Sequence, residues 1–513
     1  MNETKVIKED LTGKDKMLWN TFVSWSSHLV LIVSGFIMPR LMGQELGQDQ
    51  LGSWDFCWTF ITYLKFAGIG VGSASNRYVA KYRSERDLDA LSRLVSSVVV
   101  IQLVVGISLT IATIAIVYSI PIYLSEKLAE NLVPIQYVTF YLGISLAINM
   151  FFSASRGVLT GYHRWDLHNG LTACYSVLSI VLMMIMLFSG YGIVGMAQAY
   201  LVNTIIFEVL RVYITNRFCK GFSISLSLAN KEECWKLIGF SSKNKLITLP
   251  PIFILQSVNF MIVSALGLSA LAVFARSLAL TRHITTFMSK FTMMLTPSIS
   301  SMLAKNQKQE LNLFYLMTTK LSFAFTLPLV IFLGVFGDQI ILWWMGPAYV
   351  NHTMTIILAI GVLLPASQDS SLRLLMGMNV HGKISIYVLV VVLVSFLCFY
   401  AYYHEQGFSL EAAAFSLVVP MNLAKGILIP VYTCKKLDLN IFSYLYNSIL
   451  IPLLAVIPFA GLVFLARFFY SNDNFNLSLI SLSSAVVALT VSYCFLILTK
   501  QQRKKIIKII MKK

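Results

Sequence analysis

Long apolar stretches separated by short polar connections run along almost the whole sequence. An α-helix needs about 20 apolar residues to cross the hydrocarbon core of a bilayer, which is about 30 Å thick. By that criterion we predict an all-α polytopic membrane protein. Its predicted transmembrane helices number about 14 and lie at residues 17–42, 50–80, 92–119, 133–158, 167–189, 193–217, 236–266, 268–303, 311–337, 349–376, 384–403, 409–434, 442–469 and 476–499.

The connections between these predicted spans alternate in charge. The even-numbered connections and the two ends of the chain contain 30 of the 40 Lys and Arg residues, whereas the odd-numbered connections contain one clear cation, Lys127. Loops rich in Lys and Arg stay on the cytoplasmic side of a membrane. The pattern therefore predicts a multi-pass protein of the cell inner (cytoplasmic) membrane with both termini in the cytoplasm.

Composition supports this prediction and argues against several functions. Of the 513 residues, 57% are hydrophobic and 12% are charged, whereas a soluble domain has about 25% charged residues. The net charge of +17 lies in clusters between apolar runs, so no nucleic-acid partner is expected. There is no phosphate-binding loop motif, and no connection exceeds roughly 15 residues, so we expect no soluble catalytic domain and no enzyme. Seven scattered cysteines without paired spacing predict neither a disulfide framework nor a metal site, and no cofactor is predicted.

Two short sequence matches suggest an internal repeat. Leu159 to Gly161 (LTG) corresponds to Leu375 to Gly377 (LMG), and Ala80-Lys81 corresponds to Ala304-Lys305. Both offsets fit a repeat of six spans, which predicts two pseudo-symmetric six-helix lobes plus two C-terminal helices. The predicted segments are a cytoplasmic N-terminus (1–16), an N-lobe (17–220), a cytoplasmic linker (221–235), a C-lobe (236–436), spans 13 and 14 (437–499) and a basic cytoplasmic tail (500–513).

Predicted span eight carries cations in its middle. Placing Arg or Lys at the centre of a membrane helix costs roughly 2.5–3.5 kcal/mol, so such residues usually face a bundle interior or a wet cavity. Arg276, His283 and Lys290 follow one another at intervals of seven residues, which places them on one face of a helix, and Arg282 lies beside this stripe. The stripe predicts a binding surface for an anionic group.

Other predicted spans carry charged residues near their middles. The substrate-binding candidates, all of them mid-span cations in a positive lumen, are Lys65, Arg276, Arg282, Lys290, Lys320 and Lys425. The candidates for coupling or gating are Asp55, Glu208, His283, Asp369 and Arg40.

Simpler interpretations of these residues remain open. Lys65 could extend its amine to the interface or pair with Asp55, and His283 could be a hydrogen-bonded core histidine. Arg40 could be an interfacial anchor. The pairs that could be local helix ion pairs are Glu208 with Arg211 and Asp369 with Arg373.

The run from Gly68 to Ala80 (GIGVGSASNRYVA), the run from Arg156 to Gly161 (RGVLTG) and the arrangement of six, six and two spans resemble a known family. They are similar to polysaccharide-transport (O-antigen-type oligosaccharide) flippases of the multidrug/oligosaccharidyl-lipid/polysaccharide exporter superfamily. The resemblance implies a V-shaped pair of lobes and alternating access. The implied activity is export of a polyprenyl-diphosphate-linked oligosaccharide, a repeat unit of a cell-surface polysaccharide, from the inner to the outer leaflet through a cationic central cavity.

The resemblance also implies the partners: the lipid-linked oligosaccharide, membrane lipids, Na⁺ or H⁺ as coupling ion, and contact with polysaccharide polymerase machinery. Three alternatives are weighed against it. A cation-coupled multidrug exporter of the same superfamily typically uses carboxylates in the first lobe, and span one has none in its middle. A lipid II flippase also has fourteen spans. A membrane glycosyltransferase or polymerase resembles this chain less, because such enzymes carry a substantial outer loop.

Overall fold

Every element in the described part of the chain is a helix. The computed structural model describes residues 17–67, 72–293, 295–378, 380–472, 474–498 and 503. Within these residues, 11 helical stretches are long and apolar enough to cross a membrane. The predicted all-α polytopic fold is therefore confirmed. The predicted N-terminal segment 1–16, nearly all of the tail 500–513 and the glycines at 68–70 lie outside the described residues.

The number of spans stays a prediction, because three of the expected ones are not among these 11. These three form helices of 29, 21 and 26 residues. They are α1 (Met17–Glu45), α2 (Gly47–Ala67) and α10 (Leu268–Met293), which correspond to predicted spans one, two and eight. Two of them, α2 and α10, carry charged residues away from their ends. Charged residues in a membrane helix commonly face the bundle interior, so these two are helices on which function is expected to depend.

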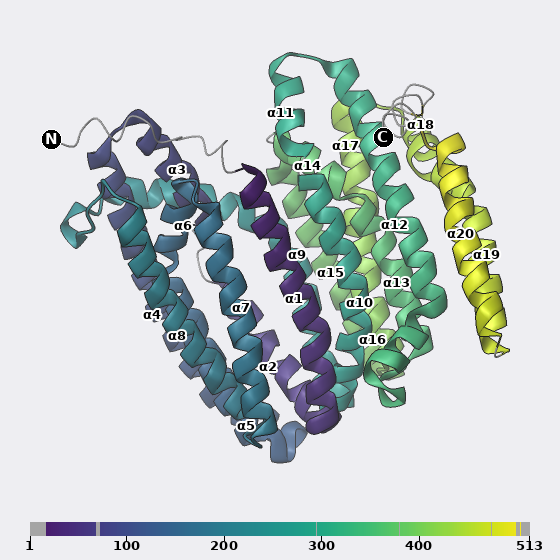
Figure 1. The fold of residues 1–513 in the computed structure, drawn as a ribbon, viewed down its shortest axis with the longest axis horizontal. Coiled ribbons are helices and arrows are strands. Elements are labelled where there is room, and N and C mark those ends of the chain that lie inside the picture. The colour runs from purple at the N-terminus through teal and green to yellow at the C-terminus, as the bar shows by residue number, and fades with distance from the viewer. Residues whose placement is uncertain are drawn as a thin grey trace. The chain divides into compact units, whose positions relative to one another are not determined.

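The chain forms two compact units, Met1–Ala272 and Val273–Lys513. In unit 1, α4 packs on α5, α5 and α7 on α8, and α1 on α7, and Figure 1 shows α1 beside α7. After α1 and α2, its helices are α3 (Gly72–Glu85), α4 (Leu88–Leu128), η3 (Ala129–Asn131), α5 (Leu132–Phe151), α6 (Ser153–Gly161), α7 (Trp165–Phe188), α8 (Gly192–Phe218), η4 (Leu226–Leu228) and α9 (Lys231–Leu266).

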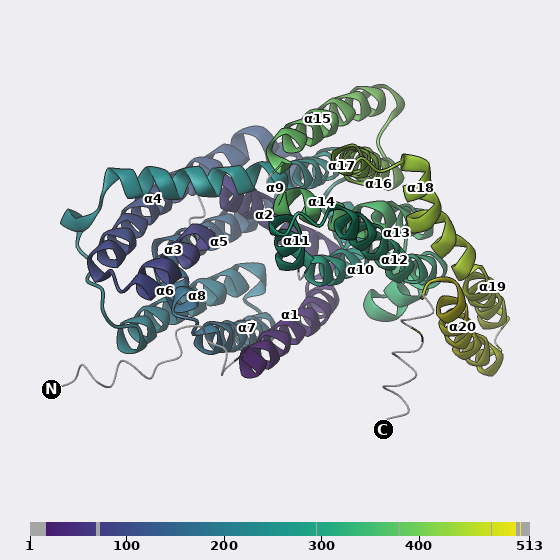
Figure 2. The same ribbon diagram turned by 90° about the horizontal axis from the view of Figure 1, so that it is seen from above.

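Unit 2 contains most of α10 and all later helices. They are α11 (Leu295–Ala304), α12 (Lys308–Met345), η5 (Pro347–Tyr349), α13 (His352–Ser367), α14 (Asp369–Gly377), α15 (His381–Gln406), α16 (Leu410–Met421), the π-helix η6 (Asn422–Leu428), α17 (Ile429–Leu437), α18 (Ile441–Leu445), the π-helix η7 (Tyr446–Leu450), α19 (Ile451–Ser471) and α20 (Phe475–Leu496). Helices α19 and α20 lie side by side in Figures 1 and 2, and α19 packs on α12 through a core that includes Phe323, Phe336 and Phe459.

The two units repeat the same helix order. The turn before α4 has Arg86 at φ 58°, and the turn before α12 has Asn306 at φ 54°, 220 positions later. Helix α5 breaks at Phe152 and α13 breaks at Gln368, 216 positions apart. Four helix pairs that pack together in unit 1 have counterparts in unit 2. The contact α3–α6 corresponds to α11–α14, α4–α5 to α12–α13, α5–α8 to α13–α16, and α7–α8 to α15–α16.

The predicted lobe boundaries, 17–220 and 236–436, stay predictions. The compact units divide later in the sequence, at Ala272, since α9 packs against α2 and α4 of unit 1. Two spans also differ from the uninterrupted helices that we expected. The spans predicted at 133–158 and 349–376 each consist of two helices in the structure.

Glycines of the motif RGVLTG let two helices of unit 1 approach closely. A Cβ added to Gly157 would lie 2.3 Å from Ser75 Oγ, and one added to Gly161 would lie 2.5 Å from Val79 Cγ1. Both contacts join α6 to α3, and Gly377 makes the equivalent contact between α14 and α11, where a Cβ would lie 2.7 Å from a carbon of Ile299. Small residues four apart are a common means of close helix packing in membranes. The motif therefore has a structural role at the α3–α6 contact.

Replacing Gly161 with valine is expected to destabilise unit 1. The added side chain has no space against Val79, and overpacking of this kind costs about 1–3 kcal/mol. Thermal unfolding of the purified protein in detergent measures the effect. Gly170→Val in α7 is the matched control, because no atom lies within 4 Å of an added Cβ there. Equal melting temperatures of the two variants would contradict the packing role.

Candidate functional site

Helix α10 has one face that packs into unit 2. Ser277, Thr281, Ile284 and Met288 are buried along this face. Ser277 Oγ and Thr355 Oγ1 are 2.9 Å apart in a hydrogen bond, and Ile284 and Met288 belong to a small apolar core with residues of α12 and α13. The interval of three or four residues between these positions is the periodicity of a helix with one buried face.

The cations of α10 lie on a different side of the helix. At about 100° per residue, the stripe of Arg276, His283 and Lys290 lies roughly 130° around the axis from the packed face. Arg276 is only 5% exposed, His283 is half-buried, and Arg282 and Lys290 are exposed. All four belong to one helix, which the structure describes from Leu268 to Met293.

Unit 1 contains a buried ion cluster centred on Glu208. Its Oε1 accepts a hydrogen bond of 2.8 Å from Arg211 Nη1 and one of 3.1 Å from Asn149 Nδ2. A second guanidinium nitrogen, Arg156 Nη2, lies 3.9 Å from the same oxygen. Glu208 is 2% exposed and Arg211 is 5% exposed. The local pair of Glu208 and Arg211 is thus present, but it belongs to a larger group with two cations and one carboxylate.

The break between α5 and α6 places Arg156 in this cluster. A helix break leaves carbonyl groups without their usual partners. The Arg156 guanidinium donates to the backbone carbonyl of Asn149 and, at 2.7 Å, to the Asn149 side-chain oxygen. Arg156 is not among the candidate site residues predicted from the sequence. The glycines beside it in RGVLTG are a sequence feature that could have drawn attention to Arg156. The kink that turns Arg156 toward Glu208 cannot be foreseen from the apolar sequence of predicted span four.

Unit 2 contains a corresponding cluster centred on Asp369. Asp369 Oδ2 accepts a hydrogen bond from the Thr292 hydroxyl and one of 3.2 Å from Arg373 Nε. Arg373 also donates to Ser289 Oγ at 3.0 Å, so both contacts connect α14 to α10. Lys425 interacts electrostatically with Asp369 and Arg373. Lys425 lies in the π-helix η6, and such insertions often mark functional sites.

The two clusters occupy related places in the repeat. Helix α8 begins at Gly192 and α16 at Leu410, an offset of 218, so Glu208 and Lys425 correspond within one residue. Their partners, Arg156 and Asp369, lie just after the helix breaks in α6 and α14. Lys425 thus stands where unit 1 has Glu208. Arg156, by contrast, falls within one residue of Arg373 by the offset of 216 and keeps its sign. Each cluster has two cations and one carboxylate.

The other candidates lie apart from these two clusters. Lys320 Nζ donates to the Leu496 carbonyl at 3.2 Å, at the end of α20. This is a structural contact within unit 2, so we leave Lys320 out of the set that would contact an anion. Lys65 is exposed near the end of α2, Asp55 is half-buried in the same helix, and Arg40 is exposed in α1. No group of His, Cys, Asp and Glu residues suited to a metal ion occurs among the residues that the structure describes.

Replacing Lys320 with methionine is expected to lower stability slightly and to leave transport unchanged. A cation at a helix C-terminus contributes about 0.3–1 kcal/mol, and methionine keeps the apolar part of the side chain. Thermal unfolding and a transport assay on the same preparation measure the two effects. Loss of transport without loss of stability would return Lys320 to the substrate-binding set.

Three solved structures are similar to this chain. A multidrug resistance MATE family transporter of the MOP superfamily, in its inward-facing conformation, has a TM-score of 0.65 and 18% identity, and the match covers 80% of this chain and 94% of that one. A MOP superfamily transporter from Pyrococcus furiosus has a TM-score of 0.61 and 18% identity over 85% of this chain and 98% of that one. A MATE protein in complex with MaL6 has a TM-score of 0.63 and 17% identity over 85% and 99%.

The chain therefore has the fold of the MATE transporters of the MOP superfamily. A family model described as polysaccharide biosynthesis protein matches residues 82–353, more than half of the sequence. The chain belongs to this polysaccharide biosynthesis family, and the predicted resemblance is confirmed at the level of family and fold. No curated protein has a matching sequence.

Proposed function

We propose that this protein is a flippase that moves a polyprenyl-diphosphate-linked oligosaccharide from the inner to the outer leaflet of the cytoplasmic membrane. Membership of the polysaccharide biosynthesis family and the MATE fold support a transporter of this kind. The observation that carries the choice of cargo is the excess of cations in the two polar clusters and on α10. Each unit has a polar cluster with one more cation than carboxylate, and α10 adds the buried Arg276.

The physical argument concerns the diphosphate. An isolated anion loses many kcal/mol of hydration on entering hydrocarbon, so a carrier must replace the water with fixed cations and donors. Arginine can hold a phosphate with two parallel hydrogen bonds, and lysine acts as a point charge. In this proposal Arg276 and Lys290 contact the diphosphate, with Arg282 in support. The polyprenyl chain remains in the lipid.

The clusters supply movable charges for alternating access. Asp369 connects α14 to α10 through Thr292, and Arg373 does so through Ser289. An arriving anion would compete with Asp369 for Arg373 and Lys425, which would loosen these contacts to α10. In this proposal Na⁺ or H⁺ is coupled to transport at four groups, namely Glu208, Asp369, Asp55 and His283. Arg40 lies at a gate. The polysaccharide polymerase machinery receives the exported oligosaccharide.

The second candidate function is multidrug export, which the fold equally accommodates. For the Pyrococcus furiosus transporter, reverse polarity of the binding pocket suggests a function different from that of its relatives. The sign of the charge in the proposed site is thus the property that distinguishes a polysaccharide flippase from a multidrug exporter. A site with excess cations repels organic cations, which is why we favour the anionic cargo over a drug, and lipid II remains one member of the same cargo class.

Binding measurements on the purified protein test this choice. A polyprenyl diphosphate disaccharide is compared with a neutral polyprenyl glycoside that has the same tail and sugar. The diphosphate is expected to bind at least about tenfold more tightly, a difference of about 1.4 kcal/mol, and to lose affinity as salt rises. Equal affinities, or displacement of the diphosphate by an organic cation, would contradict the proposal.

A further inference from the structure

The ion cluster of unit 1 carries more positive charge than its own carboxylate compensates. Arg211 and Arg156 both approach Glu208 Oε1, at 2.8 Å and 3.9 Å, and neither forms an ion pair with another carboxylate of the described residues. Arginine stays protonated in proteins, so one positive charge remains in excess. Arg211 is 5% exposed, and a charge in such surroundings is strongly destabilising unless an opposite charge compensates it.

Hydrogen bonds inside the cluster leave buried donors without acceptors. Arg211 donates from Nη1 to Glu208. Arg156 donates from Nη2 to Asn149. The Nε atoms of both arginines are buried and have no hydrogen-bond partner among the described residues, whereas about 90% of buried polar groups in folded proteins have one. A guanidinium can offer Nε together with an Nη nitrogen to one anion, so both arginines can bind a further negative group.

A cation would not balance this cluster. Glu208 Oε2 is buried and also has no partner among the described residues, so it offers an acceptor in the same region. Of the two proposed coupling ions, Na⁺ at this oxygen would increase the excess charge beside two guanidinium groups, so coupling to Na⁺ would fall to the other three groups. A water molecule can satisfy the oxygen without changing the charge. An anion, in contrast, removes the excess.

A half-buried histidine on α7 adds a third polar group. His168 interacts electrostatically with Arg156 and Arg211. It lies on the same face of α7 as Tyr175, seven residues later, whose hydroxyl is 3.1 Å from Thr204 Oγ1 of α8. His168 Nδ1 is buried without a partner among the described residues, and a neutral imidazole has one N–H that it can donate to an anion. Side chains from α6, α7 and α8 thus meet at the cluster.

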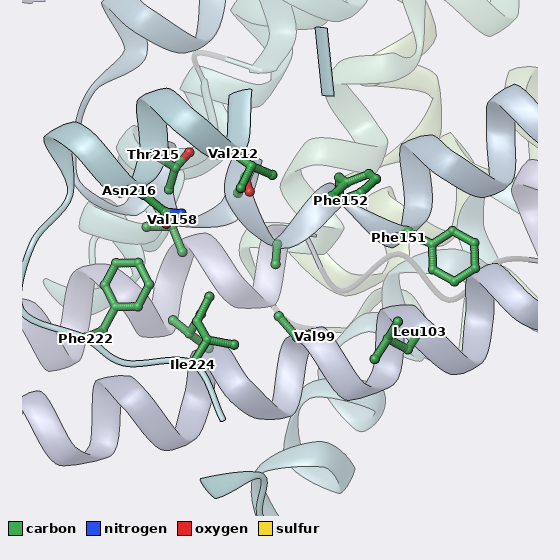
Figure 3. A pocket seen from close by; sticks show the side chains of 13 residues that line it. Val99, Leu103, Phe151, Phe152, Val158, Val212, Thr215, Asn216, Phe222 and Ile224 are labelled. Atoms are coloured by element: carbon green, nitrogen blue, oxygen red, sulfur yellow. The ribbon is translucent and has the colours of Figure 1, made fainter. Parts of the chain in front are cut away.

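The apolar pocket beside the same helix break is a different feature. Its volume is about 350 Å³, and Figure 3 shows Val99, Phe152 and Phe222 among the side chains around it. All of its lining residues are uncharged, and neither Arg156 nor Arg211 is one of them. An anion is therefore expected at the cluster and not in this pocket.

The corresponding cluster of unit 2 lacks these unpaired donors. Its charged side chains have no buried atom without a partner in the described part of the chain. Arg373 donates to Ser289 Oγ at 3.0 Å in addition to its contact with Asp369. Unit 2 has the same excess of one charge, but its second cation is Lys425, whose flexible side chain can extend its amine toward water. A fixed anion is thus expected in unit 1 and not in unit 2.

We propose that Arg156 and Arg211 bind one small inorganic anion, which is chloride in the cell. A single negative charge equals the excess of the cluster. The Arg156 side chain is 28% exposed, which gives an ion access, whereas the Glu208 side chain beside it is 3% exposed, so an ion reaches the cluster more readily than a sugar does. The anion holds α6 against α8 at the helix break. This inference does not depend on the cargo of the proposed transport.

Thermal unfolding of the purified protein in detergent tests this site. Sodium chloride is compared with sodium gluconate at constant ionic strength, because gluconate is too large for the cluster. Chloride is expected to raise the melting temperature of the wild type by about 2–4 °C, since a ligand that binds only the folded state stabilises it. Arg156→Gln leaves one cation and one carboxylate and is expected to abolish this shift. Arg217→Gln is the matched control, because it removes the same charge at an exposed position of α8.

Further variants and a direct binding measurement keep the outcome decisive. Arg211→Gln also balances the cluster and serves if Arg156→Gln does not fold. Glu208→Gln with Arg211→Gln keeps one arginine in excess, so its chloride shift is expected to remain. The chlorine magnetic resonance line of chloride is expected to broaden with the wild-type protein and to sharpen again when bromide competes. Arg156→Gln is expected to remove this broadening.

Three results would contradict the anion site. Equal melting temperatures of the wild type in chloride and in gluconate would overturn the proposal. A chloride shift that persists in both Arg156→Gln and Arg211→Gln, or that Arg217→Gln abolishes, would do the same. Stabilisation by inorganic pyrophosphate but not by chloride would also overturn it, because the ligand would then be a diphosphate group such as that of the proposed cargo.

Discussion

Replacing Arg276 with alanine is expected to reduce transport of the lipid-linked oligosaccharide roughly ten- to a hundredfold while membrane insertion is kept. Arg276 is 5% exposed, and hydrogen bonds to charged groups in such surroundings contribute about 1.5–3 kcal/mol. Arg276→Lys is expected to retain part of the activity, since it keeps the charge but loses the paired donors. Export measured in cells with equal amounts of each variant in the membrane gives the comparison.

An exposed cation in the same unit is the control for this prediction. Lys383 lies in the first turn of α15 and is exposed, so Lys383→Ala is expected to leave transport unchanged. Wild-type export by the Arg276→Ala variant would remove Arg276 from the mechanism. An equal loss for both variants would mean that any change in net charge impairs the protein.

Replacing Glu208 with glutamine is expected to cost about 3–5 kcal/mol of folding free energy, because Arg156 and Arg211 would stay buried without their carboxylate. Glutamine keeps the shape and the hydrogen bond from Asn149 but not the charge. The expected result is little folded protein in detergent, measured by size-exclusion chromatography and by thermal unfolding of the folded fraction. Removing Arg211 at the same time, with Glu208→Gln and Arg211→Gln, is expected to restore part of the stability.

Glu310 provides the matched control for the buried cluster. It is exposed in the first turn of α12, so Glu310→Gln is expected to change stability little. If Glu208→Gln folds as well as Glu310→Gln, the cluster is not stabilised by the carboxylate. Such a stable variant that had lost transport would instead make Glu208 a coupling residue.

Much of the fold follows from local sequence patterns. Length and apolar composition predict where membrane helices occur, and α7, α8 and α20 lie within a few residues of the expected spans. The repeat is visible as well, because Gly161 and Gly377 serve the same close contact in both units. The stripe on α10 depends only on helix periodicity, and α10 is continuous across it.

The sequence could not show the first helix break or the polar clusters beside the two breaks. Phe152 interrupts its helix where no proline marks the position, and the nearest cause is packing of α6 on α3. The break at Gln368 does have a local signal, because Pro365 lies three residues before it. Pro365 has no N–H to donate to the Gly361 carbonyl, which accepts from Asn422 instead.

Because of the break at Phe152, Arg156 points to Glu208, whose helix is separated from α6 by all of α7. Which side chains contact one another is decided by the rotation of each helix about its own axis. That rotation depends on tertiary packing.

The most direct test of the proposed function is a flipping assay in proteoliposomes. Purified protein is reconstituted, and transbilayer movement of a polyprenyl-diphosphate oligosaccharide is compared with uptake of an organic cation dye. The account predicts movement of the lipid-linked sugar, no transport of the dye, and loss of sugar movement with Arg276→Ala. Transport of the dye alone would contradict it, and would direct attention from the cations of α10 to Asp55, Glu208 and Asp369.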